Sequence, residues 1–330
     1  MLDNYQRDIN YLRISITDRC NLRCRYCMPK EGLSQIGHDD ILRYEEILRV
    51  VRIAVSLGVA KVRITGGEPL VRRGIVPFVA ALKSVPGIQD LSLTTNGVLL
   101  ERCAADLFKA GVRRINISLD SLNPDKYLQI TRGGCLDDVL QGIAAVYAQG
   151  FSPIKINVVA IKGFNDDEIL DFARLTLDNP YQVRFIELMP LGHPGRDNLG
   201  KYLASEVIMR TIAGKYTLNP VNGEREKMDG PAKMYRIAGG MGEIGFISPV
   251  SHHFCHRCNR LRLTADGNLR ACLLSDEEVD LKTPLRTGCT DNLLETLIKE
   301  AIAGKPRKHE IQFDEQSLRK CVKNMSAIGG

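Results

Sequence analysis

The segment YLRISITDRCNLRCRYCMP, residues 11–29, joins a strand-like pattern to three closely spaced cysteines. Its first part is rich in apolar and β-branched residues, and its second part places Cys20, Cys24 and Cys27 in the spacing C-x3-C-x2-C. A structural zinc site normally closes with four protein ligands, whereas each of the four irons of a cubane iron–sulfur cluster takes one ligand. Three thiolates therefore favour a [4Fe–4S] cluster that keeps one iron open to a small molecule.

The alternative for this motif is a zinc site with three cysteines, completed by a histidine or aspartate from elsewhere in the chain. A site of this kind closes when its fourth ligand is supplied from a distance. The chain has only six histidines, and the nearest one downstream of the motif is His38. The cluster is therefore the favoured interpretation.

Beyond this segment, the first two thirds of the chain alternate strand-like and helix-like patterns. Apolar residues recur at helical spacing in residues 44–58 and 136–150, and both stretches end in glycine. Strands are predicted at residues 11–17, 61–65, 91–95, 115–120, 154–161 and 183–189. Such alternation indicates parallel β/α units. We predict an α/β fold built on a partial (β/α)6 TIM-like barrel, with a doubly wound open sheet as the alternative.

Glycine and polar residues gather where the predicted strands end. The second strand leads into TGGEP (65–69) and the third into TTNG (94–97), while the fourth ends in SLDS (118–121) and the sixth in ELMP (187–190). The carboxyl ends of the strands of a β/α barrel converge on one face, where active sites are built. We therefore expect these segments to share one site with the first three cysteines.

The pattern changes after about residue 215, so two regions are predicted: a partial barrel over 1–215 and a smaller α+β region with antiparallel strands over 216–330. Within the second region, LRLTADGNLRACL (261–273) predicts a hairpin, because Asp266-Gly267 is a strong turn signal. A helix is expected over 290–303, followed by GKPRKHE, which is interpreted as a basic linker.

A second set of three thiols lies in the C-terminal region. Cys255, Cys258 and Cys272 have the spacing C-x2-C-x13-C. By the same reasoning they favour a second cluster with one free iron, which assigns the protein two [4Fe–4S] clusters. On spacing alone, a zinc site with three cysteines and one histidine competes with this interpretation, and its candidate histidines are His252, His253 and His256.

Composition limits the class of protein further. The chain has 330 residues, is 44% hydrophobic and 25% charged, and carries a net charge of +6, which suits a phosphate-bearing ligand. No apolar run approaches 18 residues, and no basic start precedes an apolar run, so neither a membrane span nor a secretion signal is expected. Ten cysteines without an export signal indicate a reducing, cytoplasmic compartment.

The first cysteine motif, with Tyr26 directly before Cys27, resembles the signature of the radical S-adenosylmethionine (SAM) superfamily. The resemblance implies that the open iron chelates SAM, and that one electron then splits SAM into methionine and a 5′-deoxyadenosyl radical. GGEP (66–69) resembles the segment that holds the methionine amino group in this superfamily. The SAM-binding residues implied by the resemblance are Tyr26, Gly66, Gly67, Glu68, Ser118 and Met189.

A wider set of motifs resembles the GTP 3′,8-cyclase family of molybdenum cofactor biosynthesis. The matching segments are residues 11–29, 61–73, 184–192 and 254–273 together with the terminal Gly329-Gly330, and the departure is a variable loop at 192–200. The resemblance implies a lyase whose radical removes the hydrogen at C3′ of GTP. The C3′ radical then attacks guanine C8 to give (8S)-3′,8-cyclo-7,8-dihydroguanosine 5′-triphosphate. The free iron of the second cluster would bind the guanine.

A triphosphate requires cationic partners, and guanidinium groups can bind two oxygens at once. Arg260 and Arg262 lie two residues apart, so in a strand both would face the same side. The GTP-binding residues implied by the resemblance are Arg13, Arg63, Thr94, Lys155, Arg260, Leu261 and Arg262. Further candidates are Lys61, Arg184 and Arg257, and the Gly329-Gly330 tail is expected to reach into the site.

The resemblance also implies partners: a flavodoxin- or ferredoxin-like one-electron donor, cyclic pyranopterin monophosphate synthase as the next pathway enzyme, and a second copy in a homodimer. The sequence leaves two alternative functions open. One is another radical SAM enzyme with an auxiliary cluster that modifies peptides or proteins, although such enzymes usually carry more C-terminal cysteines. The other is a zinc-stabilised nucleic-acid-binding protein, disfavoured because Trp is absent and aromatic residues make up only 6%. Neither a membrane nor a nucleic acid is expected as a partner.

Overall fold

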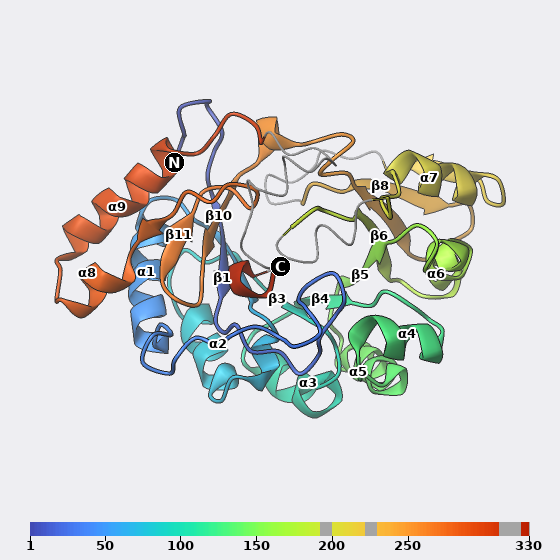
Figure 1. Cartoon of the computed structure of the whole chain (residues 1–330), viewed down its shortest axis with the longest axis horizontal. Coiled ribbons are helices and arrows are strands. Elements are labelled where there is room, and N and C mark those ends of the chain that lie inside the picture. Colours follow the sequence, from blue (N-terminus) through green and yellow to red (C-terminus); the bar gives the residue numbers. More distant parts are fainter. Residues whose placement is uncertain (192–199, 222–229, 310–324, 330) are drawn as a thin grey trace.

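In the computed structural model of the chain, the described residues are 1–191, 200–221, 230–309 and 325–329. A twelve-stranded sheet forms the centre of the molecule, and helices cover its outer side (Figure 1). Six parallel strands in chain order make up the middle of the sheet: β1 (Tyr11–Ser15), β2 (Lys61–Thr65), β3 (Asp90–Thr95), β4 (Arg114–Ser118), β5 (Ile154–Ala160) and β6 (Gln182–Glu187). The predicted α/β fold with six parallel units is confirmed.

Helices connect these strands along the outer side of the sheet. They are α1 (Tyr44–Ser56), α2 (Ile75–Lys83), α3 (Leu100–Lys109), α4 (Pro124–Thr131), α5 (Leu136–Ala148), α6 (Ile169–Asp178) and α7 (Ser205–Ala213). In α1, Ile47, Val50, Val51 and Ala54 are buried at the spacing of one helical face. Burying a side chain such as Val or Ile contributes about 1.5–3 kcal/mol, so this face holds the helix on the sheet.

The side chains of the strands alternate between two environments. In β1, Leu12 and Ile14 belong to the hydrophobic core between sheet and helices, whereas Tyr11 and Arg13 face the interior of the barrel. This alternation follows from the two-residue period of a strand. The core therefore lies on the convex side of the sheet, which leaves the concave side for polar residues.

The C-terminal region extends the sheet at both ends. β10 (Arg260–Leu263) pairs in parallel with β1, and β9 (Glu243–Ile247) pairs in parallel with β6. Farther out the strands are antiparallel: β11 (Asn268–Arg270) and β12 (Val279–Asp280) beyond β10, and β8 (Lys233–Ile237) and β7 (Leu218–Pro220) beyond β9. The predicted hairpin is confirmed. One sheet thus runs through both predicted regions, and the boundary at residue 215 stays a prediction.

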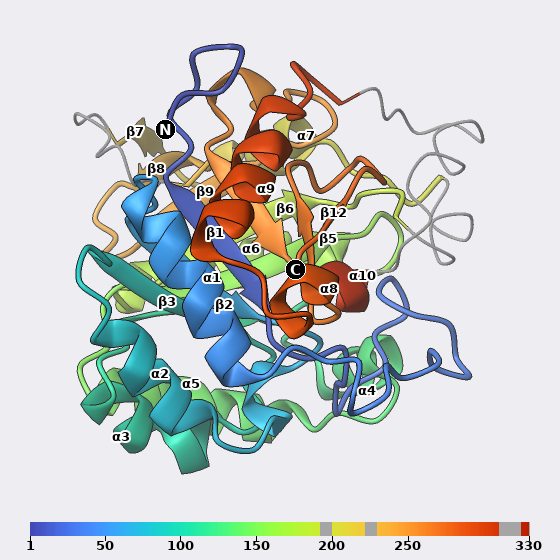
Figure 2. The ribbon, with the colours of Figure 1, turned by 90° about the vertical axis from the view of Figure 1, so that its left-hand side faces the viewer.

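The described part of the C-terminal region also contains the helices α8 (Lys282–Arg286), α9 (Asp291–Ala303) and α10 (Met325–Ile328). The Thr290 hydroxyl accepts a hydrogen bond from the amide of Leu293 and caps α9, which confirms the helix expected over 290–303. α9 packs beside α1, and α10 lies near the centre of the molecule (Figure 2). Among the helices of the described residues, none has the length and hydropathy that a membrane span requires.

Candidate active site

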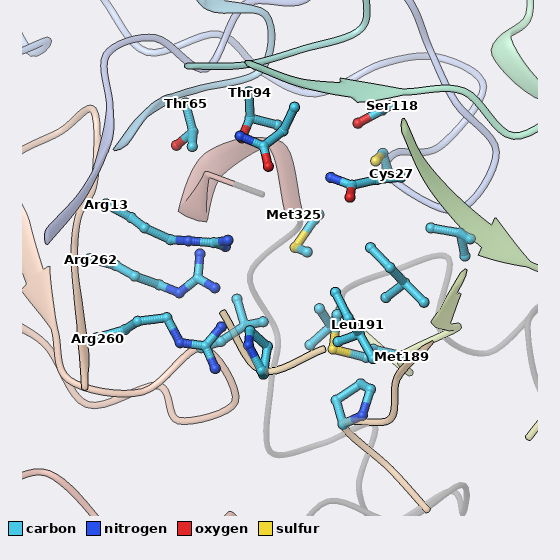
Figure 3. Close-up of a pocket in the computed structure, with 18 of the residues that line it drawn as sticks. Arg13, Cys27, Thr65, Thr94, Ser118, Met189, Leu191, Arg260, Arg262 and Met325 are labelled. Atoms are coloured by element: carbon cyan, nitrogen blue, oxygen red, sulfur yellow. The ribbon is translucent and has the colours of Figure 1, made fainter. Parts of the chain in front are cut away.

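The carboxyl ends of the parallel strands open into one large cavity, which both sets of three cysteines line. The first set comes from the loop after β1, and the second from the segments that flank β10 and β11. Figure 3 shows Cys27 of the first set. Predicted site residues that line this cavity are Arg13, Tyr26, Arg63, Gly66, Gly67, Thr94, Ser118, Arg184, Met189, Arg260 and Arg262. The structure therefore brings most of the predicted residues together, although they are scattered along the chain.

The first three thiols are close enough to influence one another. Burial raises the pKa of Cys24 well above its ordinary value, and the neighbouring Cys27, Asp120 and Cys20 raise it further. The pKa of Cys27 is raised by burial, Asp120 and Cys20. A bound metal cation reverses this effect, because thiolates are its ligands. The thiol set is thus suited in its chemistry to an iron–sulfur cluster.

Backbone contacts fix the loop that carries these thiols. The amide of Cys27 donates to the carbonyl of Cys24 at 2.9 Å, which forms a tight turn. The amide of Arg25 donates to the carbonyl of Ile130 at 2.9 Å, so the loop is attached to the end of α4. The Asn96 side-chain amide lies 3.8 Å from the Cys20 sulfur. Asn96 was not predicted, although it lies in the TTNG segment.

Gly66 and Gly67 are required by close packing of two backbones. A Cβ atom on Gly67 would lie 2.5 Å from the Arg19 carbonyl oxygen, and one on Gly66 would lie 2.7 Å from the Thr17 oxygen. Such separations exclude any other residue. The Gly67 amide donates to the Thr17 carbonyl at 2.7 Å. The two glycines therefore hold the cysteine loop against the end of β2 and leave backbone groups exposed to the cavity.

Glu68 does not line the cavity, in contrast to the expectation that it contacts SAM. Its fully buried carboxylate accepts hydrogen bonds from the Leu70 amide at 3.0 Å, the Thr95 hydroxyl at 2.8 Å and the Asn96 amide at 2.7 Å. Burial raises its pKa to about 7 against the effect of these donors. Glu68 thus fixes the loop that places Asn96 beside Cys20.

A buried pair, Tyr26 and Asp120, forms part of the wall near the first thiols. The Tyr26 hydroxyl donates to Asp120 at 2.6 Å, and the Val159 amide donates to the other carboxylate oxygen at 2.8 Å. Burial raises the pKa of Asp120 to about 6, although both hydrogen bonds lower it. Asp120 was not among the predicted site residues, although it lies in the SLDS segment.

Three arginines form a cationic wall on one side of the cavity. Figure 3 shows Arg13, Arg260 and Arg262 extending into the cavity from neighbouring strands. Arg13 and Arg262 are register partners in the parallel pair of β1 and β10, so their side chains face the same side. Burial, together with Arg13 and Arg260, holds the pKa of Arg262 well below its ordinary value. An anion bound between these groups would relieve their repulsion.

Tyr11 is an unpredicted member of this wall. The Nε of Arg13 donates to its hydroxyl at 3.3 Å, and Lys61 and Arg63 lie over its ring at 5.0 and 5.5 Å. Burial alone would raise the pKa of Tyr11, but Arg63, Arg13 and Lys61 lower it to about 7. The hydroxyl group of Tyr11 is therefore expected to lose its proton near neutral pH.

Four predicted GTP-binding residues do not line the cavity. Lys61 and Lys155 are buried among other cations, and Lys61 forms an ion pair with Asp90 at 3.0 Å. Burial and the neighbouring Arg184 lower the pKa of Lys155 to about 5. Leu261 belongs to the hydrophobic core, because it alternates with Arg260 and Arg262. Arg257 is exposed on the protein surface.

The second set of thiols differs from the first in its electrostatics. Cys255 and Cys258 are joined by a hydrogen bond from the Cys258 amide to the Cys255 carbonyl at 3.1 Å, and Cys272 follows β11. Burial raises the pKa of Cys258, but Arg260 and Lys305 outweigh it and lower the pKa to about 6. Burial raises the pKa of Cys272, so within this set the electrostatics favour the thiolate form at Cys258.

The histidines near the second set have other contacts. His252 lies 2.8 Å from Glu206 on the surface, and His256 is exposed. His253 packs against His309 with ring centroids 5.5 Å apart. These three histidines were the candidates for a zinc site with three cysteines.

The C-terminal Gly329 lies against the wall of the cavity. Its carbonyl accepts a hydrogen bond from the Arg262 guanidinium, and its φ is +79°. A Cβ atom here would lie 2.5 Å from the Thr65 hydroxyl and 2.9 Å from the Ser15 Cβ. Gly329 thus contacts Arg262 and Thr65, which line the cavity, whereas Gly330 lies outside the described residues, and the entry of the tail into the site stays a prediction.

Comparison with known proteins agrees with this arrangement. Residues 14–176 match the radical SAM superfamily, and residues 181–311 match the family described as Molybdenum Cofactor Synthesis C. Structures of Streptococcus suis SuiB share the fold. The form bound to its precursor peptide SuiA has a TM-score of 0.59 and 14% identity, covering 97% of this chain and 76% of SuiB. The form bound to SAM has a TM-score of 0.58 and 15% identity, covering 88% and 68%. The fold and the cysteine-lined site define a radical SAM enzyme.

The particular family follows from closer relatives. The GTP 3′,8-cyclase of Heliobacterium modesticaldum is 51% identical over 331 residues, and that of Moorella thermoacetica is 50% identical over 330 residues. In both cases the match covers 100% of this chain and 100% of the relative. The chain belongs to the GTP 3′,8-cyclase family.

Proposed function

We propose that this protein cyclises GTP between C3′ of the ribose and C8 of the guanine, giving (8S)-3′,8-cyclo-7,8-dihydroguanosine 5′-triphosphate, the first step of molybdenum cofactor biosynthesis. Cys20, Cys24 and Cys27 would hold an iron–sulfur cluster which, with SAM and one electron, would supply the 5′-deoxyadenosyl radical for removal of the C3′ hydrogen. A further electron and a proton would complete the dihydro product. The main support for the proposal is that both thiol sets and the cationic wall line the same cavity.

The six clustered cysteines are proposed to hold two [4Fe–4S] clusters, one for each set. The first set would leave one iron for SAM, beside Tyr26, Gly66, Gly67, Ser118 and Met189. The second set would leave one iron for the guanine base. Three supporting thiolates per cluster are one fewer than its irons, which is the condition for binding a small molecule directly.

The cationic wall is proposed to bind the triphosphate. Arg260 and Arg262 would bind phosphate oxygens with charge-assisted hydrogen bonds, next to Arg13 and Arg63. This arrangement orients GTP with its base towards the second thiols and its ribose towards the first. Arg184 would contribute positive potential from within the barrel. Lys61 is paired with Asp90, and Lys155, whose pKa is about 5, would add positive charge only when a nearby anion raises that pKa. Thr94 is proposed as a further GTP contact.

The cavity is also suited to protecting a reactive carbon radical. Apolar side chains line the part of the wall around Met189, namely Leu191, Leu274 and Met325. They exclude water and keep other hydrogen donors away from the reacting carbon. No general base is needed for abstraction of a hydrogen atom, so the contribution of the chain is orientation and shielding.

The proposed cyclisation of GTP also leads us to propose several partners. A one-electron donor of the flavodoxin or ferredoxin type would reduce the enzyme, and cyclic pyranopterin monophosphate synthase would receive the product. We further propose a homodimer and a cytoplasmic location. Co-purification and size measurements in solution test these points independently of the activity.

Anaerobic reconstitution tests the core of the proposal. Two clusters require about eight irons per chain. Cys24→Ser should abolish reductive cleavage of SAM, whereas Cys258→Ser should retain some SAM cleavage but lose GTP conversion. Stoichiometric zinc without iron, or intact SAM cleavage in Cys24→Ser, would contradict the assignment.

A further inference from the structure

Lys305 is a buried lysine directly behind the second thiol set. Only 3% of it is exposed, although its segment GKPRKHE was expected to be a basic linker. Its Nζ donates to the carbonyl of Arg260 at 2.8 Å and also to the carbonyl of Ala271. Arg260 lies two residues after Cys258, and Ala271 directly precedes Cys272. One ammonium group therefore ties together the two segments that carry these thiols.

Arg7 holds the third segment of the same set. Its Nη1 donates to the carbonyl of Cys255 at 2.8 Å, and its Nη2 donates to the carbonyl of Pro306 at 2.9 Å. Arg7 is neutralised by Asp3, whose carboxylate accepts from its Nε at 2.6 Å. Arg7 and Lys305 together connect the backbone beside all three thiols, and Arg7 also anchors the segment that carries Lys305.

The charge of Lys305 is compensated differently from that of Arg7. Over residues 1–191, 200–221, 230–309 and 325–329, no carboxylate forms an ion pair with Lys305. The anionic groups that act on it are Cys258 and Cys272, while Arg260 and Arg7 add positive charge. A buried charge is costly unless an opposite charge lies nearby. Among the residues that the structure describes, the thiolates of the second set are the available counter-charge.

We propose that Lys305 is a positioning residue for the second thiol set and the internal counter-ion of the metal cluster that these thiols hold. This inference rests on the proposed second cluster. A fixed positive charge favours the reduced, more negative state of a cluster, so Lys305 should raise its reduction potential. Arg7 would fix the lysine and the Cys255 backbone, and its ion pair with Asp3 reduces the positive charge that it adds.

The experiment uses a triple variant, Cys20→Ser, Cys24→Ser and Cys27→Ser, which cannot hold the first cluster. This background protein is reconstituted anaerobically, so that only the second cluster can form. Iron content and the midpoint potential, followed by electron paramagnetic resonance, are measured for the background alone and with Lys305→Met, Lys305→Arg or Lys299→Met added. Lys299 is a matched control, because it lies on the exposed face of α9 in a surface pair with Glu295. Lys305→Met should shift the reduction equilibrium about tenfold towards the oxidised state, or about 59 mV for a one-electron couple. Lys305→Arg and Lys299→Met should stay near the parent value.

The outcomes separate this inference from the proposed function. A background protein that binds no second cluster would contradict the proposed function before Lys305 is tested. Equal potentials and iron contents for the parent and Lys305→Met would overturn the role of Lys305. If Lys305→Met loses its iron, retention of iron by Lys305→Arg supports the inference. Loss of iron in both variants overturns the counter-ion role.

Discussion

Arg262 donates a hydrogen bond to the backbone carbonyl of Gly329, so one guanidinium of the cationic wall also holds the C-terminal tail. A guanidinium has five N–H donors, which is enough to bind a phosphate oxygen and a carbonyl together. The tail and the proposed triphosphate site are therefore coupled through one side chain. This coupling makes the tail a part of the site that can be tested without disturbing the core.

Gly329→Ala should displace the tail and lower the yield of cyclised product more than tenfold. The added methyl group would meet Thr65 and Ser15, and the positive φ of Gly329 disfavours alanine. Gly288→Ala is the matched control, because Gly288 has nearly the same φ of +78° but no atom within 4 Å of the added Cβ. Product yield, iron content and the melting temperature are compared. A fully active Gly329→Ala enzyme would show that the tail is dispensable.

Arg260→Ala and Arg262→Ala should each weaken GTP binding by about 1.5–3 kcal/mol, the range for hydrogen bonds to charged groups. SAM binding should change little, because both arginines lie on the side of the second thiols. Arg262→Ala should lower turnover more than Arg260→Ala, since it also releases Gly329. Equilibrium titrations of both ligands provide the measurement. Unchanged GTP affinity in both variants would remove the arginines from the substrate site.

Titration of Tyr11 should be visible near neutral pH in the ligand-free protein. Arg63, Arg13 and Lys61 outweigh burial and lower its pKa to about 7 from 10.0. Because the folded pKa is depressed, the phenolate stabilises the fold fully above the unfolded pKa, and this contribution is lost as the pH falls through about 7. The near-ultraviolet absorbance of tyrosinate should therefore rise between pH 6 and 8, roughly one unit to either side. Tyr11→Phe should lack this change.

Triphosphate binding should oppose this ionisation. Phosphate oxygens would approach the same cations, so the pKa of Tyr11 should rise and GTP binding should take up protons near pH 8, roughly one unit above the ligand-free pKa. Calorimetry in buffers of different ionisation enthalpy measures this uptake, with Tyr11→Phe as the control. Identical proton uptake in both proteins would exclude Tyr11 as its source.

Asp90→Asn should destabilise the protein by about 3–5 kcal/mol, because it removes one partner of a buried ion pair. Asp90 lies 3.0 Å from Lys61 and 2.8 Å from Arg114, and the side chains of Asp90 and Lys61 are at most 5% exposed. Chemical denaturation measures the change in unfolding free energy. Asp291→Asn, in a surface pair with Arg49, should cost less than about 1 kcal/mol. Equal effects would contradict the importance of burial.

The elements that could be predicted are those with a local pattern. The apolar stripe of α1 and the β-branched runs of β2 and β5 predicted these elements almost to the residue. The parallel pairing of β10 with β1 could not be predicted, because it joins residues about 250 positions apart and leaves no periodic signal. The burial of Lys305 was missed for the same reason, since its acceptors are carbonyls that the sequence does not reveal.

In the candidate site, too, some residues could be predicted from the sequence and others could not. The cysteines and glycines were found because metal ligation and close backbone packing demand particular residue types at fixed spacing. Tyr11 was missed because an aromatic residue in a strand is ordinarily a core residue, and its unusual state depends on Arg63 and Lys61 from the next strand. Glu68 was assigned to SAM because its place in the GGEP segment gives no indication that its carboxylate is fully buried and accepts hydrogen bonds from Thr95 and Asn96.

The placement of β9 and β10 has a consequence for synthesis of the chain. These strands complete both flanks of the six central strands, yet both follow residue 242. A nascent chain that has emerged only as far as β6 presents two bare sheet edges, whose amide and carbonyl groups can pair with another molecule. Translation at roughly 5–20 residues per second leaves these edges open for several seconds. Recovery of active protein should therefore depend on low temperature or on chaperones that shield the incomplete sheet, more than on the stability of the finished fold.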